Sequence, residues 1–378
     1  MSAQRGSGRS LPYTRDGVGI GPAGGLAAGG AMDDTQADSG TRTPTLQEVA
    51  TAAGVSLATA SNALSGRRGV SVALRERVLE AAASLGYSRS GSARGRARTD
   101  RITVGIVLPD VRNPAYAELA HAFEQEGTSR DWSIVLASSG YEPDQELEAL
   151  ETLVQSADGI IVSPSRPPRS GLHRLAASPV PIVTCDEPAD SLLIAGSVRS
   201  DNFGGGRTAA HHLVDAGGTR FGLVGGNGYL PSTQERRDGF LAGLADRGVP
   251  ASAVTIAGSA YGMDGGQAGM AELLEEAPDV DAVFALSDMQ AIGALFEAQQ
   301  SGRSIPGDLL LCGYDGIAWT QRISPTITTI RQDWPGIAAR AMELLDEAMN
   351  GAHAPGYGSA RVLPVALVEG ESTRRDGA

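Results

Sequence analysis

The sequence predicts a small all-α helix-turn-helix headpiece followed by an α/β body of two doubly wound parallel-sheet lobes. Three observations lead to this fold class. Short amphipathic helical patterns occupy residues 45–86, an Arg-rich and Gly-rich stretch follows, and continuous apolar runs then alternate with helical patterns. Apolar strands joined by helices are typical of parallel sheets covered on both faces, and two such series predict two lobes.

The first helix is predicted to begin at Thr45. Thr45 and Glu48 have the spacing of a capping box, in which a hydroxyl and a carboxylate satisfy backbone N–H groups at a helix start. Apolar residues then recur at three- and four-residue spacing, and Gly54 ends the run because it tolerates a left-handed conformation. The predicted buried positions are Leu46, Val49, Ala50 and Ala53.

Two further helices complete the predicted headpiece. Ser56 can cap a second helix, with Ala60, Ala63 and Leu64 packed toward the first. Small and hydroxylated side chains then form its outer face, namely Leu57, Ala58, Thr59, Ser61 and Asn62. Ser71 can cap a third helix that stops at Gly86, with an apolar side of Val72, Val78, Leu79, Ala82 and Leu85. An ordinary helical hairpin is the alternative for the first two helices.

The composition also predicts where the domains begin and end. Residues 1–43 are rich in Gly, Ala, Ser and Arg and are expected to be a disordered N-terminal extension, with Met32 as an alternative start. We expect a helix-turn-helix domain over 44–88, a hinge linker over 89–101, the two-lobed body over 102–370 and a flexible C-terminal tail over 371–378.

Charge is distributed unevenly along the 378 residues, whose net charge is −13. Between residues 43 and 101, nine Arg face four acidic residues, which gives +5 there and leaves −18 for the remainder. A basic segment attached to an acidic body is compatible with nucleic-acid binding at one end. We favour a simpler origin for this segment, a general preference for Arg in a chain without Lys.

Several other classes of protein are disfavoured. Cys185 and Cys312 lie in separate apolar runs, so buried thiols in a reducing, cytoplasmic compartment are expected rather than a disulfide or a metal site. No apolar run has the length of a membrane span, and no secretion signal is recognisable. The adjacent His211 and His212 would point in different directions on a helix. Without a nucleophile motif, nucleotide fingerprint or metal spacing, we expect neither an enzyme nor a cofactor.

The periodicity of the body predicts its elements. The strand-like runs are ITVGIVLP, SIVLAS, GIIVSP and PIVTC in the first series and RFGLVGG, AVTIAG, DAVFALS and DLLLCGYD in the second. Helical patterns lie near residues 115–125, 145–155, 171–177, 205–215, 234–246, 265–275 and 289–300, and a last strand is expected over 362–368. The Gly204 to Gly206 triplet indicates a helix start rather than a phosphate loop.

The headpiece resembles that of the lactose repressor family of bacterial transcriptional regulators. The family pattern is matched nearly in register by three segments: TLQEVATAAGVS, LATASNALSG and the spacing of VS, Arg77 and LGY. The body is similar to the family's effector-binding domain, which is itself like periplasmic sugar-binding proteins, through SDNFGGGRTAAHHL, RRDGFLAGL, SDMQAIGAL, GYDG and ITTIRQD. This resemblance covers roughly residues 45–373 and implies a regulator that binds operator DNA as a homodimer and a small-molecule effector between its lobes.

The resemblance implies which headpiece residues contact DNA. Leu57, Ala58 and Asn62 match the family's base-reading positions, and Asn62 would favour adenine. Thr45, Leu46, Ser56, Thr59, Ser61 and Tyr87 are further expected contacts. In the hinge, Arg94 matches the family pattern but Arg96 stands where the family has a leucine, so Arg94 and Arg96 are expected to contact phosphates or a narrow minor groove. A flexible charged tether is the alternative.

Four residues are expected to bind the effector. Ligands of open parallel sheets bind beyond the carboxyl ends of the strands, and Tyr116 and Asp288 each follow such a strand. Arg236 matches the family arginine of the R-x-x-G-F pattern, and Tyr116 and Tyr261 fall near aromatic positions of the family. The alternatives are a helix cap for Asp288, a surface ion pair for Arg236 and ordinary packing for the tyrosines.

We therefore expect a sequence-specific transcriptional regulator, a repressor whose operator binding is controlled by a small-molecule carbohydrate. A regulator that needs its ligand as a corepressor is the first alternative. A non-enzymatic small-molecule binding protein and an architectural DNA-binding protein are the others, but the first would require export and the second would leave a two-lobed clamp unused.

Overall fold

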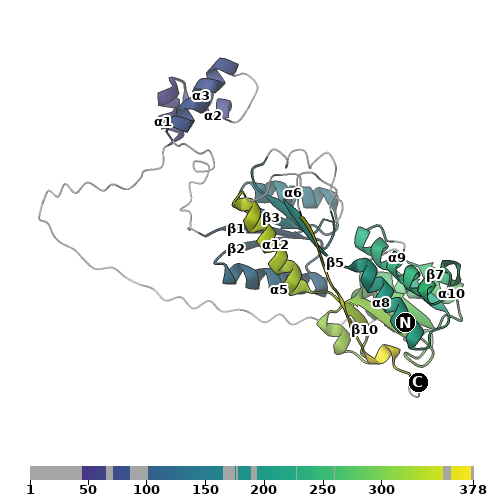
Figure 1. Ribbon diagram of the computed structural model, residues 1–378. Coiled ribbons are helices and arrows are strands. Elements are labelled where there is room, and N and C mark those ends of the chain that lie inside the picture. The colour runs from purple at the N-terminus through teal and green to yellow at the C-terminus, as the bar shows by residue number, and fades with distance from the viewer. Residues whose placement is uncertain are drawn as a thin grey trace, which may run out of the picture. The chain divides into compact units, whose positions relative to one another are not determined.

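The computed structural model describes residues 45–64, 71–85, 101–164, 175, 178–188, 194–226, 228–258, 260–351 and 359–375. Its contacts divide the chain into two compact units, Met1–Ala97 with the headpiece and Arg98–Ala378 with the body (Figure 1). The N-terminal extension predicted over 1–43 and the predicted hinge, except for residue 101, lie outside the described residues.

The headpiece consists of three helices, α1 (Leu46–Ala53), α2 (Leu57–Leu64) and α3 (Val72–Ser84). Small apolar side chains form its core: Val49, Ala50, Ala53, Ala60, Ala63, Val78 and Ala82. The prediction for the third helix was wrong at Leu79 and Leu85, which are 47% and 40% exposed. The buried stripe of α3 runs through Val78 and Ala82, one helical turn apart, so Leu79 is rotated away from it and Leu85 follows the helix end.

The first lobe of the body contains a six-stranded parallel sheet in the order β11-β5-β4-β3-β1-β2. Its strands are β1 (Thr103–Leu108), β2 (Ser133–Ser138), β3 (Gly159–Val162), β4 (Ile182–Cys185), β5 (Gly196–Ser200) and β11 (Ser359–Leu363). The helices α5 (Pro114–Ser129) and α12 (Trp334–Met349) pack together on one face, and α6 (Pro143–Val154) covers the other. Of the helix predicted over 171–177, only residue 175 is described.

The second lobe repeats this architecture with the order β12-β10-β9-β8-β6-β7. Its strands are β6 (Phe221–Val224), β7 (Val254–Ala257), β8 (Ala282–Ala285), β9 (Leu310–Asp315), β10 (Thr328–Arg331) and β12 (Ala366–Val368). Its helices are α8 (Asn202–Asp215), α9 (Pro231–Asp246), α10 (Gly262–Glu276) and α11 (Asp288–Gln300), with 3-10 turns η1 (Ala251–Ala253), η2 (Ala318–Gln321) and η3 (Glu371–Thr373). Figure 1 shows this second lobe, mostly green, beside the first lobe, which is blue to teal apart from the yellow-green α12.

The chain crosses between the lobes three times. The crossings lie between β5 and α8, between β10 and α12, and between β11 and β12. The single last strand predicted over 362–368 was therefore wrong, because Pro364 separates two strands that belong to different sheets. At the crossings, Asp201 N–H donates to the carbonyl of Leu363 over 2.8 Å, so two of the three connections contact each other.

The C-terminal residues pack against the second lobe. Ser372 and Thr373 are buried, and Ser372 Oγ accepts from the backbone N–H of Thr328 over 2.9 Å. His212 lies 2.8 Å from Thr373 Oγ1 through its Nε2 atom. The tail predicted as flexible from residue 371 thus begins too early, since 371–375 are part of the packed lobe.

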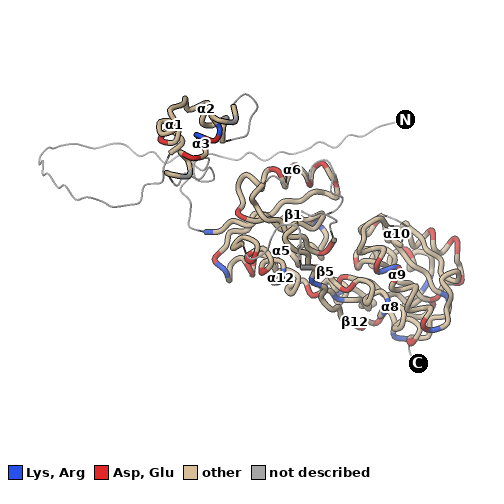
Figure 2. Tube along the Cα trace, turned by 45° about the horizontal axis from the view of Figure 1, so that its top comes forward, with Lys and Arg blue, Asp and Glu red and all other residues tan. Residues whose placement is uncertain are grey.

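Acidic positions recur along the outer helices of the body, which agrees with its predicted negative charge (Figure 2). Cys185 and Cys312 are both buried thiols in strands of different lobes, as predicted. None of the described helices is long and apolar enough to cross a membrane.

Candidate functional site

A pocket lies between the two lobes, where both sheets present the carboxyl ends of their strands. The first lobe contributes Asn113, Tyr116, Tyr141, Asp186 and Glu187, and the second contributes Ser232, Arg236, Tyr261, Ser287, Gln290 and Asp315. Gln332 and Trp334, which lie at the crossing between β10 and α12, also line the pocket. The space between the lining atoms is about 500 Å³ with the open mouth included. This is the place that the strand-end rule predicts for a ligand.

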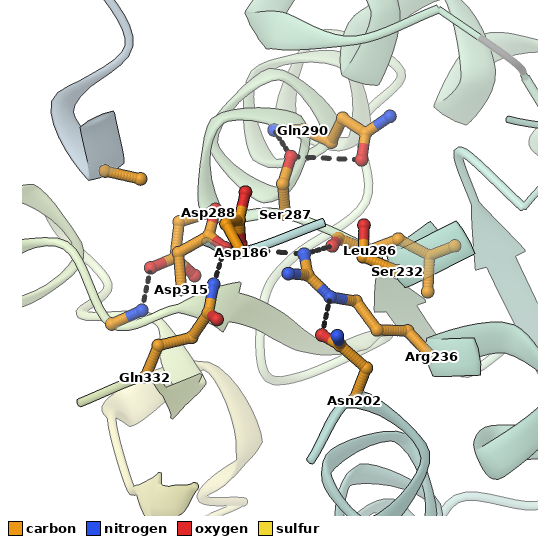
Figure 3. Close-up of polar contacts among 12 residues, drawn as sticks. Asp186, Asn202, Ser232, Arg236, Leu286, Ser287, Asp288, Gln290, Asp315 and Gln332 are labelled. Atoms are coloured by element: carbon orange, nitrogen blue, oxygen red, sulfur yellow. Dashed lines mark hydrogen bonds and ion pairs between the residues drawn. The ribbon is translucent and has the colours of Figure 1, made fainter. Parts of the chain in front are cut away.

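Arg236 is the buried cation of the pocket. Its Nε atom donates to Asn202 Oδ1 over 2.9 Å, and its Nη1 atom donates to the carbonyl of Leu286 over 2.8 Å. Nη1 also lies 3.4 Å from Asp315 Oδ1, and the guanidinium carbon lies 3.8 Å from the ring centroid of Tyr314. Figure 3 shows the guanidinium directed at the carboxyl groups from the opposite side of the pocket. These contacts exclude the surface ion pair that was the alternative for Arg236.

Close packing of α8 against α9 places Arg236. A Cβ atom on Gly206 would lie 2.0 Å from the carbonyl oxygen of Arg236, and one on Gly239 would lie 2.0 Å from that of Phe203. Only glycine permits this approach. Asp201 caps α8 by accepting from the N–H of Gly204, which presents Asn202 to the Arg236 side chain. The glycine triplet therefore marks a helix start, as predicted, and also the helix contact that orients Arg236.

Three carboxyl groups face Arg236, namely Asp186 and Glu187 after β4 and Asp315 at the end of β9. Tyr116 and Ser163 donate their hydroxyls to Asp186 Oδ2 over 3.1 and 3.4 Å. Glu187 reaches across to the second lobe, where it accepts from Ser232 N–H over 3.1 Å and from the Ser232 hydroxyl. Gln332 donates to Asp315 Oδ1 over 2.9 Å.

Backbone strain is concentrated at this pocket. Tyr141, Asp186 and Asp315 adopt φ values of 63°, 65° and 119°, in the left-handed region that disfavours side chains. Among the described non-glycine residues, Asp131 is the only other with positive φ. Strained positions of this kind cluster at ligand sites, where the surrounding structure compensates their energetic cost.

Burial governs the protonation of these acids. Burial raises the pKa of Glu187 to about 8, and the neighbouring Asp186 adds to the effect. Burial also raises the pKa of Asp315 to about 6, against the opposing influence of Arg236. The pKa of Asp186 is raised by burial too, although Arg236, Tyr116 and Ser163 act in the opposite direction. The cost of burying several negative charges near one cation explains these shifts.

Asp288, predicted as a ligand contact, is not among the residues that line the pocket. Its side chain is fully buried, and Oδ2 accepts from the N–H groups of Gly316 and Ile317 over 2.7 and 2.8 Å. Thr329 donates its hydroxyl to Oδ1 over 2.6 Å. Asp288 thus fixes the loop that follows Asp315, and Asp315 presents the carboxyl group to the pocket.

The tyrosines form an aromatic group that spans the lobes. Tyr141 of the first lobe stacks on Tyr261 of the second, with ring centroids 5.8 Å apart and an interplanar angle of 6°. Tyr116 meets the edge of Tyr141 at 6.5 Å, and Tyr229 meets Tyr261 at 5.7 Å. Both predicted tyrosines, Tyr116 and Tyr261, therefore line the pocket together with Arg236.

Several pocket residues escaped the sequence analysis. Asp186, Glu187 and Gln332 each follow a strand, and Asp315 ends one, so the rule that identified Tyr116 and Asp288 also applied to them. Asp315 even lies within the GYDG motif. Tyr141 and Trp334 also follow strand ends, β2 and β10, but their orientation toward the pocket depends on a left-handed turn and on the crossing of α12 to the first lobe.

The headpiece has the local geometry that the capping signals predict. Thr45 N–H donates to Glu48 Oε2 over 2.6 Å, Glu48 N–H donates to Thr45 Oγ1 over 3.3 Å, and Gly54 has a φ of 63°. Ser56 Oγ accepts from Thr59 N–H over 3.1 Å at the start of α2.

The structure describes only some of the residues that are predicted to contact DNA. Thr45, Ser56 and Leu57 are exposed, and Leu46, Thr59 and Ser61 are half-buried. The side chains of Ala58 and Asn62, and Tyr87, Arg94 and Arg96 as a whole, lie outside the described part of the headpiece.

Known families match both units of the chain. The bacterial regulatory proteins of the lacI family match residues 45–90, and the periplasmic binding protein-like domain matches residues 210–373. The first match covers the headpiece, and the second contains Arg236, Asp288, Asp315 and Gln332.

Full-length relatives extend the similarity across both units. The chain is 32% identical over 308 residues to catabolite control protein A of Priestia megaterium, which covers 81% of this chain and 92% of that protein. It is 30% identical over 331 residues to the HTH-type transcriptional repressor CytR of Escherichia coli K12, with coverage of 87% and 96%. A solved complex of the transcriptional regulator CelR with cellobiose is 31% identical, with a TM-score of 0.63 and coverage of 87% and 99%.

Because these relatives are at least 30% identical over more than four fifths of the chain and a lacI-family model matches its headpiece, the chain belongs to the LacI family of bacterial regulatory proteins and is a DNA-binding transcriptional regulator controlled by a small molecule.

Proposed function

We propose that the chain is a repressor whose release from operator DNA is controlled by a carbohydrate bound between the two lobes. The observation that carries this proposal is the buried guanidinium of Arg236 beside polar atoms that lack partners. Gln332 Oε1 and Trp334 Nε1 are buried without a hydrogen-bond partner among the described residues. Hydroxyl groups both donate and accept, so a saccharide can satisfy both atoms. The cellobiose bound to the CelR relative supports this ligand class.

The ligand contacts follow from the lining of the pocket. Arg236 would bond ligand hydroxyls through the outer edge of its fork, and Asp186 and Asp315 would accept from them. Tyr116 and Tyr261 would contact the ring faces. Asp288 would act indirectly, by fixing the Gly316 and Ile317 backbone behind Asp315.

The headpiece would read DNA through α2. Leu57, Ala58 and Asn62 are the proposed base contacts, with Thr45, Leu46, Ser56, Thr59, Ser61, Tyr87, Arg94 and Arg96 at the sugar–phosphate backbone or the minor groove. Asn62→Ala should relax specificity at one base pair by about 1–3 kcal/mol, because Asn bonds adenine bidentately. An unchanged site preference in a competitive binding assay would remove Asn62 from the set.

The proposed mechanism links the two units through a homodimer. Two headpieces would occupy successive major-groove faces of a near-palindromic operator. Closure of the lobes on the effector would change the dimer surface and separate the hinges, which weakens DNA binding. Operator and effector then oppose each other with a reciprocal coupling of about 1–3 kcal/mol. The pocket is assigned a binding role without catalysis, and the protein acts in the cytoplasm, where its operator lies.

The test is binding of the purified full chain to fragments of its own upstream DNA, with and without neutral sugars, amino sugars and nucleosides. Site-specific binding that one compound releases supports repression with that compound as inducer. Binding that appears only with a compound reverses the sign and identifies a corepressor. Salt-dependent binding without sequence preference, unaffected by every compound, would overturn the proposal in favour of an architectural role.

A further inference from the structure

The charged residues of the pocket indicate the charge of its ligand, beyond the carbohydrate class already proposed. Asp186, Glu187 and Asp315 are 4%, 2% and 5% exposed, whereas Arg236 is the cation that acts on all three. Arg236 already donates to Asn202, to the carbonyl of Leu286 and to Asp315. Because its pKa of about 8 keeps Glu187 protonated near neutral pH, the guanidinium faces the carboxylates of Asp186 and Asp315, and one shared guanidinium cannot neutralise both in a buried site.

We propose that the effector carries a primary ammonium group and is an amino sugar or a related polyhydroxy amine, with the ammonium seated between Asp186 and Asp315. This inference rests on the proposed function and specifies the ligand of the same pocket. The two carboxyl groups come from opposite lobes and act on each other electrostatically, which disfavours closure while both are ionised. An ammonium between them converts this repulsion into attraction.

The acceptors left free in the pocket agree with such a ligand. Asp186 accepts the Tyr116 and Ser163 hydroxyls at Oδ2, and its Oδ1 accepts no hydrogen bond from the described residues. Gln332 donates to Asp315 through Nε2, which leaves Oε1 buried without a partner. An ammonium supplies three donors and no acceptor, which suits a carboxylate and an amide oxygen better than a hydroxyl does.

The unpaired donor explains why the ligand also needs hydroxyl groups. Trp334 Nε1 is buried without a partner among the described residues, and an ammonium cannot accept from it. A hydroxyl or ring oxygen can. The pocket therefore combines an acidic centre for the amine with a donor for the polyol. A simple alkylamine cannot accept from Trp334, and a neutral sugar can bond these groups but brings no positive charge to the acidic centre.

The test compares matched pairs that differ only by amines in place of hydroxyls, one in each monosaccharide pair and two in the disaccharide pair. Glucosamine and glucose, galactosamine and galactose, mannosamine and mannose, and the glucosamine disaccharide with cellobiose are titrated into the full chain by calorimetry near neutral pH. We expect at least one amine to bind about tenfold or more tightly than its partner, a difference of about 1.4 kcal/mol. N-acetylglucosamine, which lacks the charge, should lose this advantage.

Variants identify the carboxyl group that gives the pocket its preference for an amine. Asp186→Asn should reduce the preference for the amine about tenfold or more while keeping the shape of the site. Asp315→Asn, which removes the other carboxylate of the proposed seat, serves as the second variant if the first does not fold. Asp238→Asn, which removes an exposed acid paired with Arg237 on the same helix as Arg236, should keep the full preference.

Each outcome decides the proposal. Equal or tighter binding of the neutral sugar in every pair, or no binding by any of the amines, overturns it. If a neutral sugar binds the pocket and releases DNA while no amine binds more tightly than its partner, the regulatory function stands and the amine proposal is overturned. An amine that binds tightly without changing DNA affinity supports the ligand class and contradicts its role as effector.

Discussion

The two lobes share one topology but contribute different charges to the pocket, because the first provides two acids and the second provides an arginine and one acid, Asp315. If the strands of each lobe are numbered one to six in chain order, both sheets have the strand order 6-5-4-3-1-2. The sixth strand is parallel to its neighbour in the first lobe and antiparallel to it in the second. The first lobe supplies Asp186 and Glu187, and the second supplies Arg236. The fold is therefore nearly symmetric, and ligand specificity arises from which side chains follow the strand ends.

Removing the cation of the second lobe should have the largest effect. Arg236→Ala leaves the carboxyl groups of the first lobe without a counter-charge, and breaking a buried ion pair costs about 3–5 kcal/mol. We expect effector affinity to fall more than about a hundredfold in calorimetry. Arg236→Lys should lose less, because the charge remains but the bidentate fork is lost.

The matched control for this prediction is Arg207→Ala. Arg207 pairs with Asp246 on the surface, where the two side chains are 52% and 40% exposed, and such pairs contribute little. Retention of effector binding by Arg236→Ala at the level of this control would show that the second lobe does not provide the charge.

Within the second lobe, Asp288 contrasts with Asp315, because Asp288 is an acid close to the pocket that does not line it. Asp288→Ala leaves the N–H groups of Gly316 and Ile317 without acceptors and should lower the free energy of unfolding by about 2–3 kcal/mol. Asp288→Asn keeps an acceptor oxygen and should lose much less. Denaturant unfolding measures both. Unchanged stability with lost effector binding in both variants would instead support the direct ligand contact predicted from the sequence.

Glu187 of the first lobe makes the stability of the body depend on pH. Burial raises its pKa from the ordinary 4.5 to about 8, so between these values the folded chain holds a proton that the unfolded chain has lost. Stability contributed by this group is complete below pH 4.5 and is lost as the pH rises toward about 8, at about 1.4 kcal/mol per pH unit.

Thermal unfolding across that pH range measures this contribution. Glu187→Gln, which cannot ionise but can still accept from Ser232, should flatten the slope. A slope that persists unchanged in the variant would assign the pH dependence to other acids.

The smallest expected effect concerns the aromatic contact between the lobes. Tyr141 and Tyr261 stack at 5.8 Å, and such a pair contributes about 0.5–1.5 kcal/mol beyond its buried area. Tyr141→Ala and Tyr261→Ala, with the double variant, form a cycle read out by thermal unfolding. Additive losses would mean that the stack does not join the lobes.

The sequence predicted those features that depend on neighbouring residues. The capping box of Thr45 and Glu48, the left-handed Gly54 and the helix start at the Gly204 to Gly206 triplet are set within one turn of chain, and the structure agrees at each. Leu79 was misassigned because its burial depends on the angle at which α3 meets the other helices, and no local pattern encodes that angle.

The pocket was predicted in part. The Arg236 pattern, the strand-end rule and the family's aromatic positions placed Arg236, Tyr116 and Tyr261 at the ligand site, and all three line the pocket. Asp288 satisfied the same rule, but hydrogen bonds from a loop 28 and 29 residues further along direct its carboxylate away. The return of α12 to the first lobe, which brings Trp334 to the pocket, is a long-range event that periodicity cannot reveal.

The most direct test of ligand control is the affinity of the effector measured with and without saturating operator DNA. Coupling is reciprocal, so the change in effector affinity must equal the change that the effector causes in operator affinity. We predict weaker effector binding on the operator, by a factor of about 5–150. The same effector affinity in both states would contradict control of the headpiece by the pocket between the lobes.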